Sequence, residues 1–266
     1  MSALILEGGY TIRLGVFLLV LAMLTLLEWR LPRRVPHYSK PQRWITNFGI
    51  SFLNTAVVRL VLPIAGVGAA LWAAEHGWGL FNVLAAPAWL SIPLFLLLFD
   101  LGIYFQHRLF HWVPVLWRLH RMHHTDPDYD VSTGNRFHPL SILISAWIKL
   151  TLTVALGPPA VAVLLAEVIL NATSMFNHSN VRLAPGLDRR LRWIMVTPDM
   201  HRVHHSVEID EHNRNFGFNF PWWDRLFGTY REQPRRGHEV MDIGIEGFQD
   251  VRSMRLLPLL AQPLKS

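Results

Sequence analysis

The chain alternates between long apolar runs and short polar segments that are rich in arginine and histidine. The first apolar run, residues 14–27, lies in a stretch, residues 10–29, that as a helix would cross a hydrocarbon core of roughly 30 Å. No small-x-small cleavage site follows it, so we interpret this run as a retained membrane helix rather than a signal peptide. The pattern predicts two further spans, near residues 48–74 and 89–105.

A fourth apolar segment, residues 140–176, is interrupted by Gly157-Pro158-Pro159. Proline has no amide donor and disfavours helix in the residue before it, so the interruption predicts a helical hairpin that turns at Gly157. The first arm, about 17 residues long, is marginal for a full crossing, and the pattern fits either a re-entrant pair or two short spans. Residues 180–266 are more polar, and we expect them to form a cap of short helices near the membrane interface.

The distribution of basic residues predicts the orientation of these spans. Residues 30–43 contain five Lys or Arg residues and no Asp or Glu, whereas residues 75–87 contain no Lys or Arg. The positive-inside rule therefore places residues 30–43 in the cytoplasm, and the chain returns to that side before His107. We expect an all-α integral membrane helical bundle of about four spans, the last a hairpin broken at Gly157–Pro159, with a cytoplasmic histidine-rich helical cap.

Composition agrees with a membrane environment and narrows the chemistry. Hydrophobic residues make up 51% of the 266 residues and charged residues 17%, against about 25% charged in soluble domains. The net charge is +6, but the arginines are interleaved with apolar runs, so we expect anionic lipid rather than nucleic acid beside them. The chain has no cysteine, which excludes disulfides, thiolate zinc sites, iron–sulfur ligation and cysteine nucleophiles. A bound metal would therefore be held largely by imidazole.

Four ionisable residues lie inside the apolar runs: Arg59, Asp100, Lys149 and Glu167. A charge within a membrane is costly and indicates a functional role by default. The two basic side chains could instead extend toward the membrane interface.

Eleven of the 14 histidines lie in the region 107–212, and most form three short clusters. These are HRLFH at residues 107–111, HRMHH at 120–124 and HRVHH at 201–205. Positions i, i+3 and i+4 share one face of a helix, so we expect each cluster to direct all its imidazoles the same way, as a metal site requires. With this histidine content, His-x-x-His-His is expected roughly 0.04 times per chain by template counting, yet it occurs twice.

Imidazole ligands suit zinc, copper, iron or nickel. One structural zinc takes four ligands, so eight or more histidines imply two metal ions. Carboxylate-bridged di-iron bundles use Glu-x-x-His pairs, which this chain lacks. The alternative is a membrane metal-binding or haem-binding protein without oxygenase activity, such as a transporter or bis-histidine haem carrier; an inactive scaffold is a third candidate. A transporter would need polar ligands at mid-membrane, whereas these histidines lie at the ends of spans.

The order of the three clusters among membrane spans resembles the fatty acid hydroxylase/sterol desaturase superfamily, with its signature HX3-4H, HX2-3HH, HX2-3HH. Residues 136–139 (RFHP) resemble the F-H-P element of that superfamily, and residues 177–180 (NHSN) resemble its N-H-x-N element. Residues 215–217 (NFG) and 223–230 (WDRLFGTY) resemble its closing segments.

The resemblance covers about residues 99–231 and implies three parts. Residues 1–98 would contribute N-terminal membrane helices and the basic loop, residues 99–231 a hydroxylase-like di-iron domain, and residues 232–266 a polar C-terminal tail. The implied activity is an oxidoreductase that uses two iron ions, O2 and two electrons to hydroxylate or desaturate a C–H bond of a membrane lipid of fatty acyl, sterol or sphingoid type.

The resemblance also implies the site residues, with no catalytic residue beyond the metal ligands and no organic cofactor. Ser174 stands where some relatives have a further histidine, and His138 is either a tenth ligand or a hydrogen-bond partner of one. The candidates for orienting the ligands by hydrogen bonds are Asp199, Asn177, Asp224 and His212. The implied metal ligands are His107, His111, His120, His123, His124, His178, His201, His204 and His205.

We expect the electrons to come from a separate protein, a ferredoxin or a cytochrome b5-like protein with its reductase. The sequence shows no dinucleotide fingerprint and no haem-binding domain. The expected location is the bacterial inner membrane, or the endoplasmic reticulum of a eukaryote, with the histidines on the cytoplasmic face. Basic residues that could dock an acidic carrier, or equally anionic lipid, are Arg189, Arg190, Arg192, Arg235 and Arg236.

Overall fold

A computed structural model describes residues 2–64, 66–248 and 254–265, and in this part of the chain the regular elements are all helical. The predicted all-α class is therefore confirmed. In chain order the elements are α1 (Ser2–Arg30), α2 (Lys40–Val61), α3 (Val67–Glu75), α4 (Leu80–Val83), α5 (Ala88–Trp112), α6 (Pro114–His124), η1 (Thr133–Asn135), α7 (Pro139–Leu156), α8 (Ala160–Asn177), α9 (Pro185–Leu191), α10 (Pro198–His204), α11 (Ile209–His212), α12 (Trp222–Leu226), α13 (Leu256–Leu260) and η3 (Gln262–Leu264).

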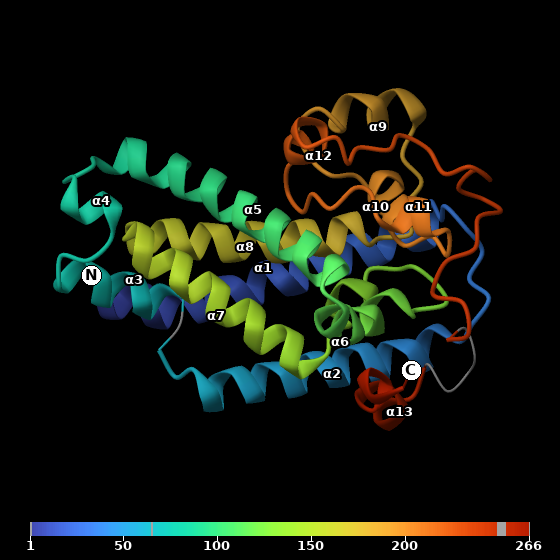
Figure 1. The fold of residues 1–266 in the computed structure, drawn as a ribbon, viewed down its shortest axis with the longest axis horizontal. Coiled ribbons are helices and arrows are strands. Elements are labelled where there is room, and N and C mark those ends of the chain that lie inside the picture. Colours follow the sequence, from blue (N-terminus) through green and yellow to red (C-terminus); the bar gives the residue numbers. More distant parts are fainter. Residues whose placement is uncertain (1, 65, 249–253, 266) are drawn as a thin grey trace.

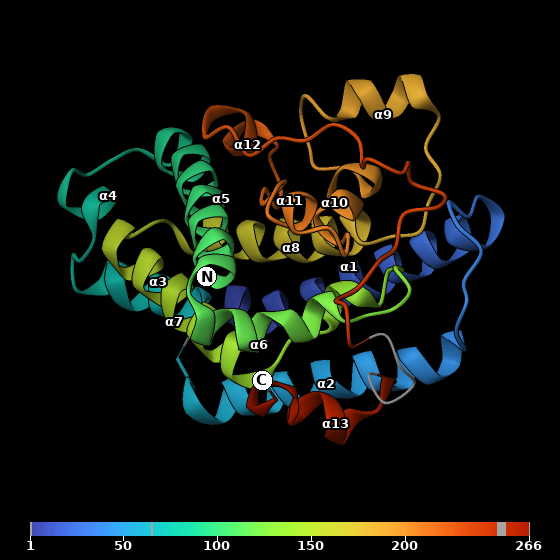
Figure 2. The ribbon, with the colours of Figure 1, turned by 45° about the vertical axis from the view of Figure 1, so that its right-hand side comes forward.

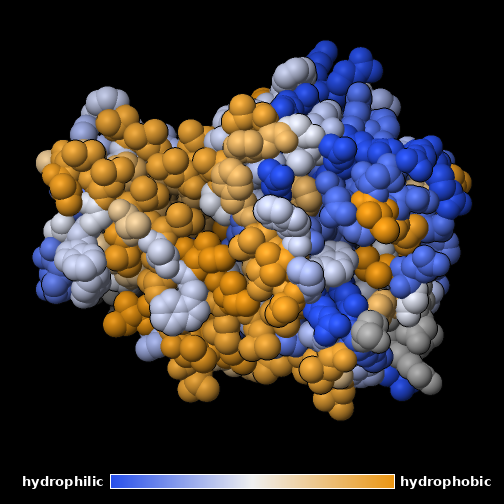
Figure 3. Space-filling view, viewed as in Figure 1, coloured by the Kyte–Doolittle hydropathy of each residue, from blue (hydrophilic) through white to orange (hydrophobic). Residues whose placement is uncertain are grey.

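Five long helices form the body of the molecule. α1 from Gly8 onward, α2, α5, α7 and α8 are each long and apolar enough to cross a membrane. They run along the long axis, α8 packing against α1 and α5 while α7 packs against α2 and α5 (Figure 1). Side chains such as Phe95 and Phe99 of α5 are buried against small residues of α8, including Ala162 and Ala166. The face of this body seen in Figure 3 is mostly hydrophobic, as expected for a membrane bundle.

The second span differs from the prediction at both of its ends. Instead of one helix over residues 48–74, the chain forms α2, which ends at Val61, and α3, which begins at Val67. Pro41 sits in the first turn of α2, where its missing amide is harmless, so the helix begins inside the basic segment. Pro63 and Gly66, which has a φ of +56°, then end the helical path. The hydrophobic pattern locates the apolar residues of this span correctly but does not predict these interruptions.

The hairpin of α7 and α8 turns at Gly157, as predicted. Gly157 is left-handed, with a φ of +61°, and its amide donates to the Thr153 carbonyl at 2.8 Å. A Cβ at this position would overlap the Trp78 carbonyl oxygen, so the turn packs tightly against the loop between α3 and α4. The hairpin therefore reaches the same end of the molecule as α3 and α4 (Figure 1), which favours two full spans over a re-entrant pair.

The polar segments gather at the opposite end as a cap (Figures 2 and 3). Asp100, one of the acids within an apolar run, anchors this cap to α5 by accepting from the amides of Asn219 and Phe220 and the indole of Trp223. The C-terminal segment packs against the same end, where Arg121 donates to the Gln262 carbonyl at 2.9 Å. Burying a charge requires such partners, so Asp100 has a structural explanation.

Candidate metal centre

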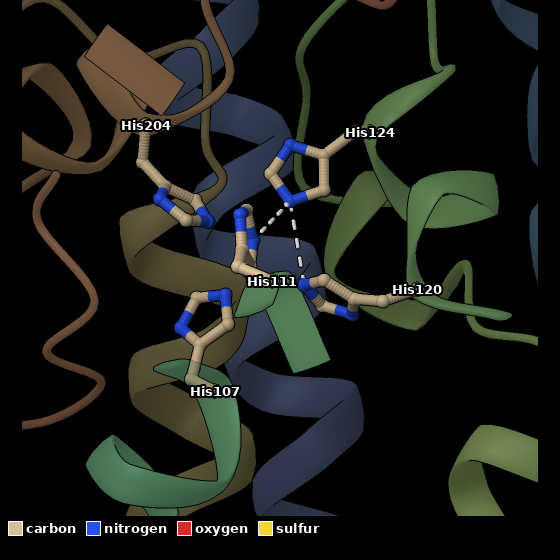
Figure 4. A group of neighbouring side chains, drawn as sticks. All are labelled: His107, His111, His120, His124 and His204. Carbon is tan, nitrogen blue, oxygen red and sulfur yellow. Dashed lines mark hydrogen bonds between the residues drawn. The ribbon is translucent and has the colours of Figure 1, made fainter. Parts of the chain in front are cut away.

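Nine histidines form two adjacent groups where the long helices meet the cap. The five-histidine group takes its side chains from α5, α6 and α10, and all five imidazoles point toward one centre (Figure 4). The four-histidine group lies next to it, with the rings of His124 and His205 4.5 Å apart. In each group one ring nitrogen of every member lies within 4.8 Å of the others. The five-histidine group is His107, His111, His120, His124 and His204; the four-histidine group is His123, His178, His201 and His205.

The two His-x-x-His-His clusters do not each serve one group, contrary to our expectation that each cluster faces one direction. His120 and His124 join the five-histidine group, but His123 joins the other; His201 and His205 join the four-histidine group, but His204 does not. At 100° per residue, positions i and i+4 are 40° apart, whereas i+3 and i+4 differ by 100°. Each cluster therefore contributes an i, i+4 pair to one group and its middle histidine to the other.

Distances within the groups fit metal ligation. The Nε2 atom of His124 lies 3.1 Å from Nε2 of His111 and 3.3 Å from Nε2 of His120. The Nε2 atom of His178 lies 3.0 Å from that of His123 and 3.1 Å from that of His201. Two imidazole nitrogens that each lie about 2.1 Å from one ion would be roughly 3.0–3.4 Å apart in octahedral or tetrahedral geometry.

Several of these nitrogens are buried without a protein partner. Among the described residues, Nε2 of His107, Nε2 of His204 and both ring nitrogens of His205 have no hydrogen-bond partner. A neutral imidazole has one N–H and one lone pair, and leaving them unpaired in the interior costs free energy. Two cations, one in each group, would bind Nε2 of His107, Nε2 of His204 and one ring nitrogen of His205, so the donor set fits a histidine-built dimetal centre.

Burial also keeps the imidazoles in the form that binds metal. Loss of hydration lowers the pKa of His123, His124 and His205 well below the usual histidine value, and neighbouring imidazoles lower it further. For His178 the same burial lowers the pKa to about 3. Neutral imidazole is the ligating species, so these side chains are ready to bind a cation at neutral pH.

Backbone carbonyls orient three of the rings. The Nδ1 atom of His107 lies 2.9 Å from the Phe216 carbonyl, and Nδ1 of His204 lies 2.7 Å from the Arg214 carbonyl. His178 makes the same contact with the Ser174 carbonyl at 2.7 Å. Donation from Nδ1–H leaves Nε2 free to ligate. The residues predicted from the sequence for this role are all side chains, because main-chain acceptors leave no signal in the residue types.

Asp224 supports the site through the backbone. Its carboxylate accepts from the amides of Phe216 and Gly217, each at 2.8 Å, and from the Thr229 hydroxyl at 2.7 Å. Burial raises the pKa of Asp224 to about 6 despite these donors. A Cβ on Gly217 would lie 2.6 Å from this carboxylate, so glycine allows the close approach. Asp224 thereby positions Phe216, whose carbonyl receives His107.

The other candidate supporting residues have different partners. Asp199 accepts from Arg33 and Arg202, and these guanidinium groups keep the pKa of its carboxyl below the usual value although burial opposes them. The Asn177 side chain donates to the Phe218 carbonyl at 3.0 Å. His212 stacks on Trp117, with ring centroids 5.4 Å apart, at the edge of the five-histidine group.

His138 lies outside both groups. Its Nδ1 accepts from the Leu140 amide at 3.2 Å and so caps α7, while its Nε2 lies 3.2 Å from the Leu260 carbonyl. Both ring nitrogens are therefore engaged with backbone groups. The structure gives this imidazole a role in joining α7 to the C-terminal segment rather than a position among the nine.

Aromatic rings enclose the histidines, which sequence reasoning did not anticipate. Phe137 stacks on His123 with ring centroids 4.3 Å apart, and Phe216 lies 5.1 Å from His111. Tyr129 lies 5.0 Å from His205. Phe137 and Phe216 occur inside the short F-H-P and N-F-G elements, which was the available signal. Such a shell keeps water away from a bound ion.

Comparison with known proteins agrees with this geometry. Residues 92–229 match the model of the fatty acid hydroxylase family. The chain is 34% identical over 177 residues to ornithine lipid hydroxylase OlsE of Rhizobium tropici, covering 66% of this chain and 51% of that protein. It is 32% identical to human alkylglycerol monooxygenase (66% and 38% covered) and 28% identical to a Delta(7)-sterol 5(6)-desaturase of Eremothecium gossypii (59% and 41%). The chain thus spans about half or less of these relatives' length, and no solved structure matches it.

Proposed function

Because the chain belongs to the fatty acid hydroxylase family, we propose that it is an O2-dependent membrane oxidoreductase that uses two iron ions to hydroxylate a C–H bond of a membrane lipid. The observation that carries this proposal is the pair of adjacent histidine groups, nine imidazoles, all buried except the half-buried His111, whose nitrogens are spaced as ligands of two ions. One ion would be held by the five-histidine group and the other by the four-histidine group.

Hydroxylation is favoured over desaturation by the relatives that match at higher identity. OlsE and the human relative, at 34% and 32% identity, are named a hydroxylase and a monooxygenase, whereas the sterol desaturase of Eremothecium gossypii is 28% identical. Desaturation remains the second candidate, since both reactions begin by removing hydrogen from the same kind of bond.

The residues around the two histidine groups have distinct roles in the proposed reaction. Bound iron supplies the activation of O2 that cleavage of an unactivated C–H bond requires. The imidazoles bind the ions without adding negative charge, and the carbonyls of Phe216, Arg214 and Ser174 hold three of the rings in the ligating tautomer. Phe137 and Tyr129 exclude water from the four-histidine group.

Electrons would arrive from a separate carrier on the cytoplasmic side, a ferredoxin or a cytochrome b5-like protein with its reductase. Of the five arginines expected to dock it, four are exposed: Arg189, Arg190, Arg235 and Arg236. Arg235 is paired with Asp210 and Arg236 with Asp242. Arg192 is instead buried and paired with Asp188 at 2.7 Å. The carrier-docking role is therefore proposed for Arg189 and Arg190.

Metal analysis combined with lipid mass spectrometry tests the proposal. The purified full chain should contain close to two iron ions, and cells that express it should gain a lipid with one added oxygen; desaturation would instead remove two hydrogens. His123→Ala and His204→Ala, one from each group, should each lower the iron content and abolish the product. His76→Ala, an exposed histidine at the opposite end, is the matched control. A Soret band, or full product formation by both ligand variants, would overturn the proposal.

A further inference from the structure

One of the nine histidines differs from the others in its exposure. His111, in the last turn of α5, is half-buried, whereas the other eight are buried. Its ring points toward the centre of the five-histidine group (Figure 4), and its Nε2 atom lies 3.1 Å from that of His124. Solvent can therefore reach this ring, so its orientation depends on the groups that hold it from outside.

Three consecutive residues at the end of α11 cover this side of the five-histidine group. His212 stacks on Trp117, whose ring lies 4.8 Å from that of His111. The carbonyl of Arg214 receives Nδ1 of His204 at 2.7 Å. The residue between these two contacts the group through its side chain. All three of these contacts are with the five-histidine group or with the tryptophan that covers it.

Asn213, the residue in the middle, determines which ring nitrogen of His111 carries the proton. Its Nδ2 donates to the Ile209 carbonyl at 3.0 Å, which fixes the orientation of the amide because a carbonyl can only accept. Its Oδ1 lies 3.3 Å from Nδ1 of His111. An amide oxygen can only accept, so Nδ1 carries the proton and Nε2 keeps its lone pair for an ion.

Asn213 is exposed, but the chain on both sides of it is anchored. On one side, the carboxylate of Glu211 accepts from the Arg231 side chain at 3.1 Å and from the Arg235 amide at 2.6 Å. On the other side, the Asn215 side chain donates to the Arg231 carbonyl at 2.8 Å. The amide of Asn213 is therefore presented to the imidazole from a fixed backbone.

This contact differs in kind from those of the other oriented rings. His107, His204 and His178 are held by main-chain carbonyls, which a substitution at the accepting residue does not remove. The acceptor for His111 is a side chain. A single substitution can therefore remove the support of this one ring and leave the other three contacts in place.

We propose that Asn213 is a positioning residue for His111 and thereby determines how tightly the five-histidine group binds its ion. The proposal rests on the proposed dimetal enzyme and adds a residue that controls one of its two ions. Without the acceptor, the half-buried ring can turn or change tautomer, and the five-histidine group loses a ligand. The four-histidine group does not depend on this contact, so its ion stays bound.

Cobalt binding to the metal-free full chain tests the proposal without oxidation of any lipid. Two backgrounds separate the groups, because His178→Ala impairs the four-histidine group and His204→Ala impairs the five-histidine group. Titration with Co²⁺, followed by its visible absorption, then reports the affinity of the group left intact. We expect Asn213→Leu to weaken Co²⁺ binding about 10–100-fold in the first background and to leave it unchanged in the second, which also shows that the variant is folded.

A conservative variant separates support of His111 from capping of α11. Asn213→Asp keeps an acceptor oxygen for the imidazole but cannot donate to the Ile209 carbonyl. In the His178→Ala background it should bind Co²⁺ at least as tightly as the chain with asparagine, because a carboxylate acceptor makes the imidazole a stronger ligand. Asn171→Leu, the same exchange at an exposed residue of α8, should change the affinity in neither background.

Three results would overturn the role of Asn213. These are equal weakening by Asn213→Leu in both backgrounds, no weakening in the first, and a loss with Asn213→Asp as large as that with Asn213→Leu. Failure of the proposed function looks different. A parent chain that binds no Co²⁺ would refute the dimetal centre, whereas the expected Co²⁺ affinities without any oxidised lipid would refute the oxygenase and leave the role of Asn213 standing.

Discussion

Asp224 supports the candidate metal centre without contacting any of its nine imidazoles. In Asp224→Asn one acceptor oxygen becomes an amide donor, so the hydrogen bonds to Phe216, Gly217 and Thr229 cannot all be kept. We expect the free energy of unfolding to fall by about 1–3 kcal/mol and iron retention to fall with it, since Phe216 orients His107. Thermal unfolding and iron content measure the two effects. Asp210→Asn, at a side chain that is 45% exposed, should change neither; an unaffected Asp224→Asn would contradict the argument.

His138 and His178 provide a test of which histidines ligate. His138→Ala removes the cap of α7 and should lower the free energy of unfolding by about 1 kcal/mol, with the iron content unchanged. His178→Ala should reduce the iron content, because this ring belongs to the four-histidine group. The iron content of the two purified variants shows which of these histidines is a ligand. Loss of iron from the His138 variant would make that residue a ligand after all.

At the level of single residues, sequence could identify the nine histidines but not their division or their partners. The helical spacing of His120, His123 and His124 places them on adjacent faces, and which face meets which group depends on how α6 packs against α5 and α10. The carbonyls of Phe216 and Arg214 could not be foreseen, because every residue has a carbonyl. These contacts depend on tertiary packing, which local sequence patterns do not reveal.

Among the elements, a buried arginine of α2 forms the ion pairs that join this helix to the loop after α6. Arg43 pairs with Asp126 at 2.7 Å and with Asp130 at 2.6 Å, and its side chain is 1% exposed. Arg43→Met would leave two buried carboxylates without their cation, so the free energy of unfolding should fall by about 3–5 kcal/mol. Arg236→Met breaks an ion pair between side chains that are 52% and 56% exposed and should cost about 0–1 kcal/mol. Comparable unfolding temperatures for both variants would refute this ranking.

The hydrophobic pattern predicts where the apolar segments lie better than it predicts where the helices begin and end. The pattern located the apolar segments and the turn at Gly157, because Gly-Pro-Pro is a local signal. It did not separate α2 from α3, since apolar residues continue through the break and only the isolated Pro63 and Gly66 mark it. Nor did it predict that α2 begins at Lys40. The role of Arg43 was equally hidden, because its partners lie more than eighty residues away.

On the scale of the whole molecule, the two ends of the bundle carry different elements. The cap and the nine histidines lie at one end, while α3, α4 and the Gly157 turn lie at the other (Figure 1). This difference between the two ends follows from the alternation of apolar runs and polar segments along the chain. The tertiary contacts that seat the cap, such as Asp100 with Trp223, required the folded structure.

The absence of cysteine makes the orientation directly measurable, since a single introduced cysteine reports its own side of the membrane. Glu75→Cys lies at the end with α3, and Arg189→Cys lies on α9 in the cap; both positions are exposed. Because five basic residues occupy residues 30–43 and none occupies residues 75–87, we expect an impermeant maleimide to label Glu75→Cys in spheroplasts and Arg189→Cys only in inside-out vesicles. The opposite labelling would place the histidines outside the cytoplasm, and a cytoplasmic ferredoxin could then not be the electron donor.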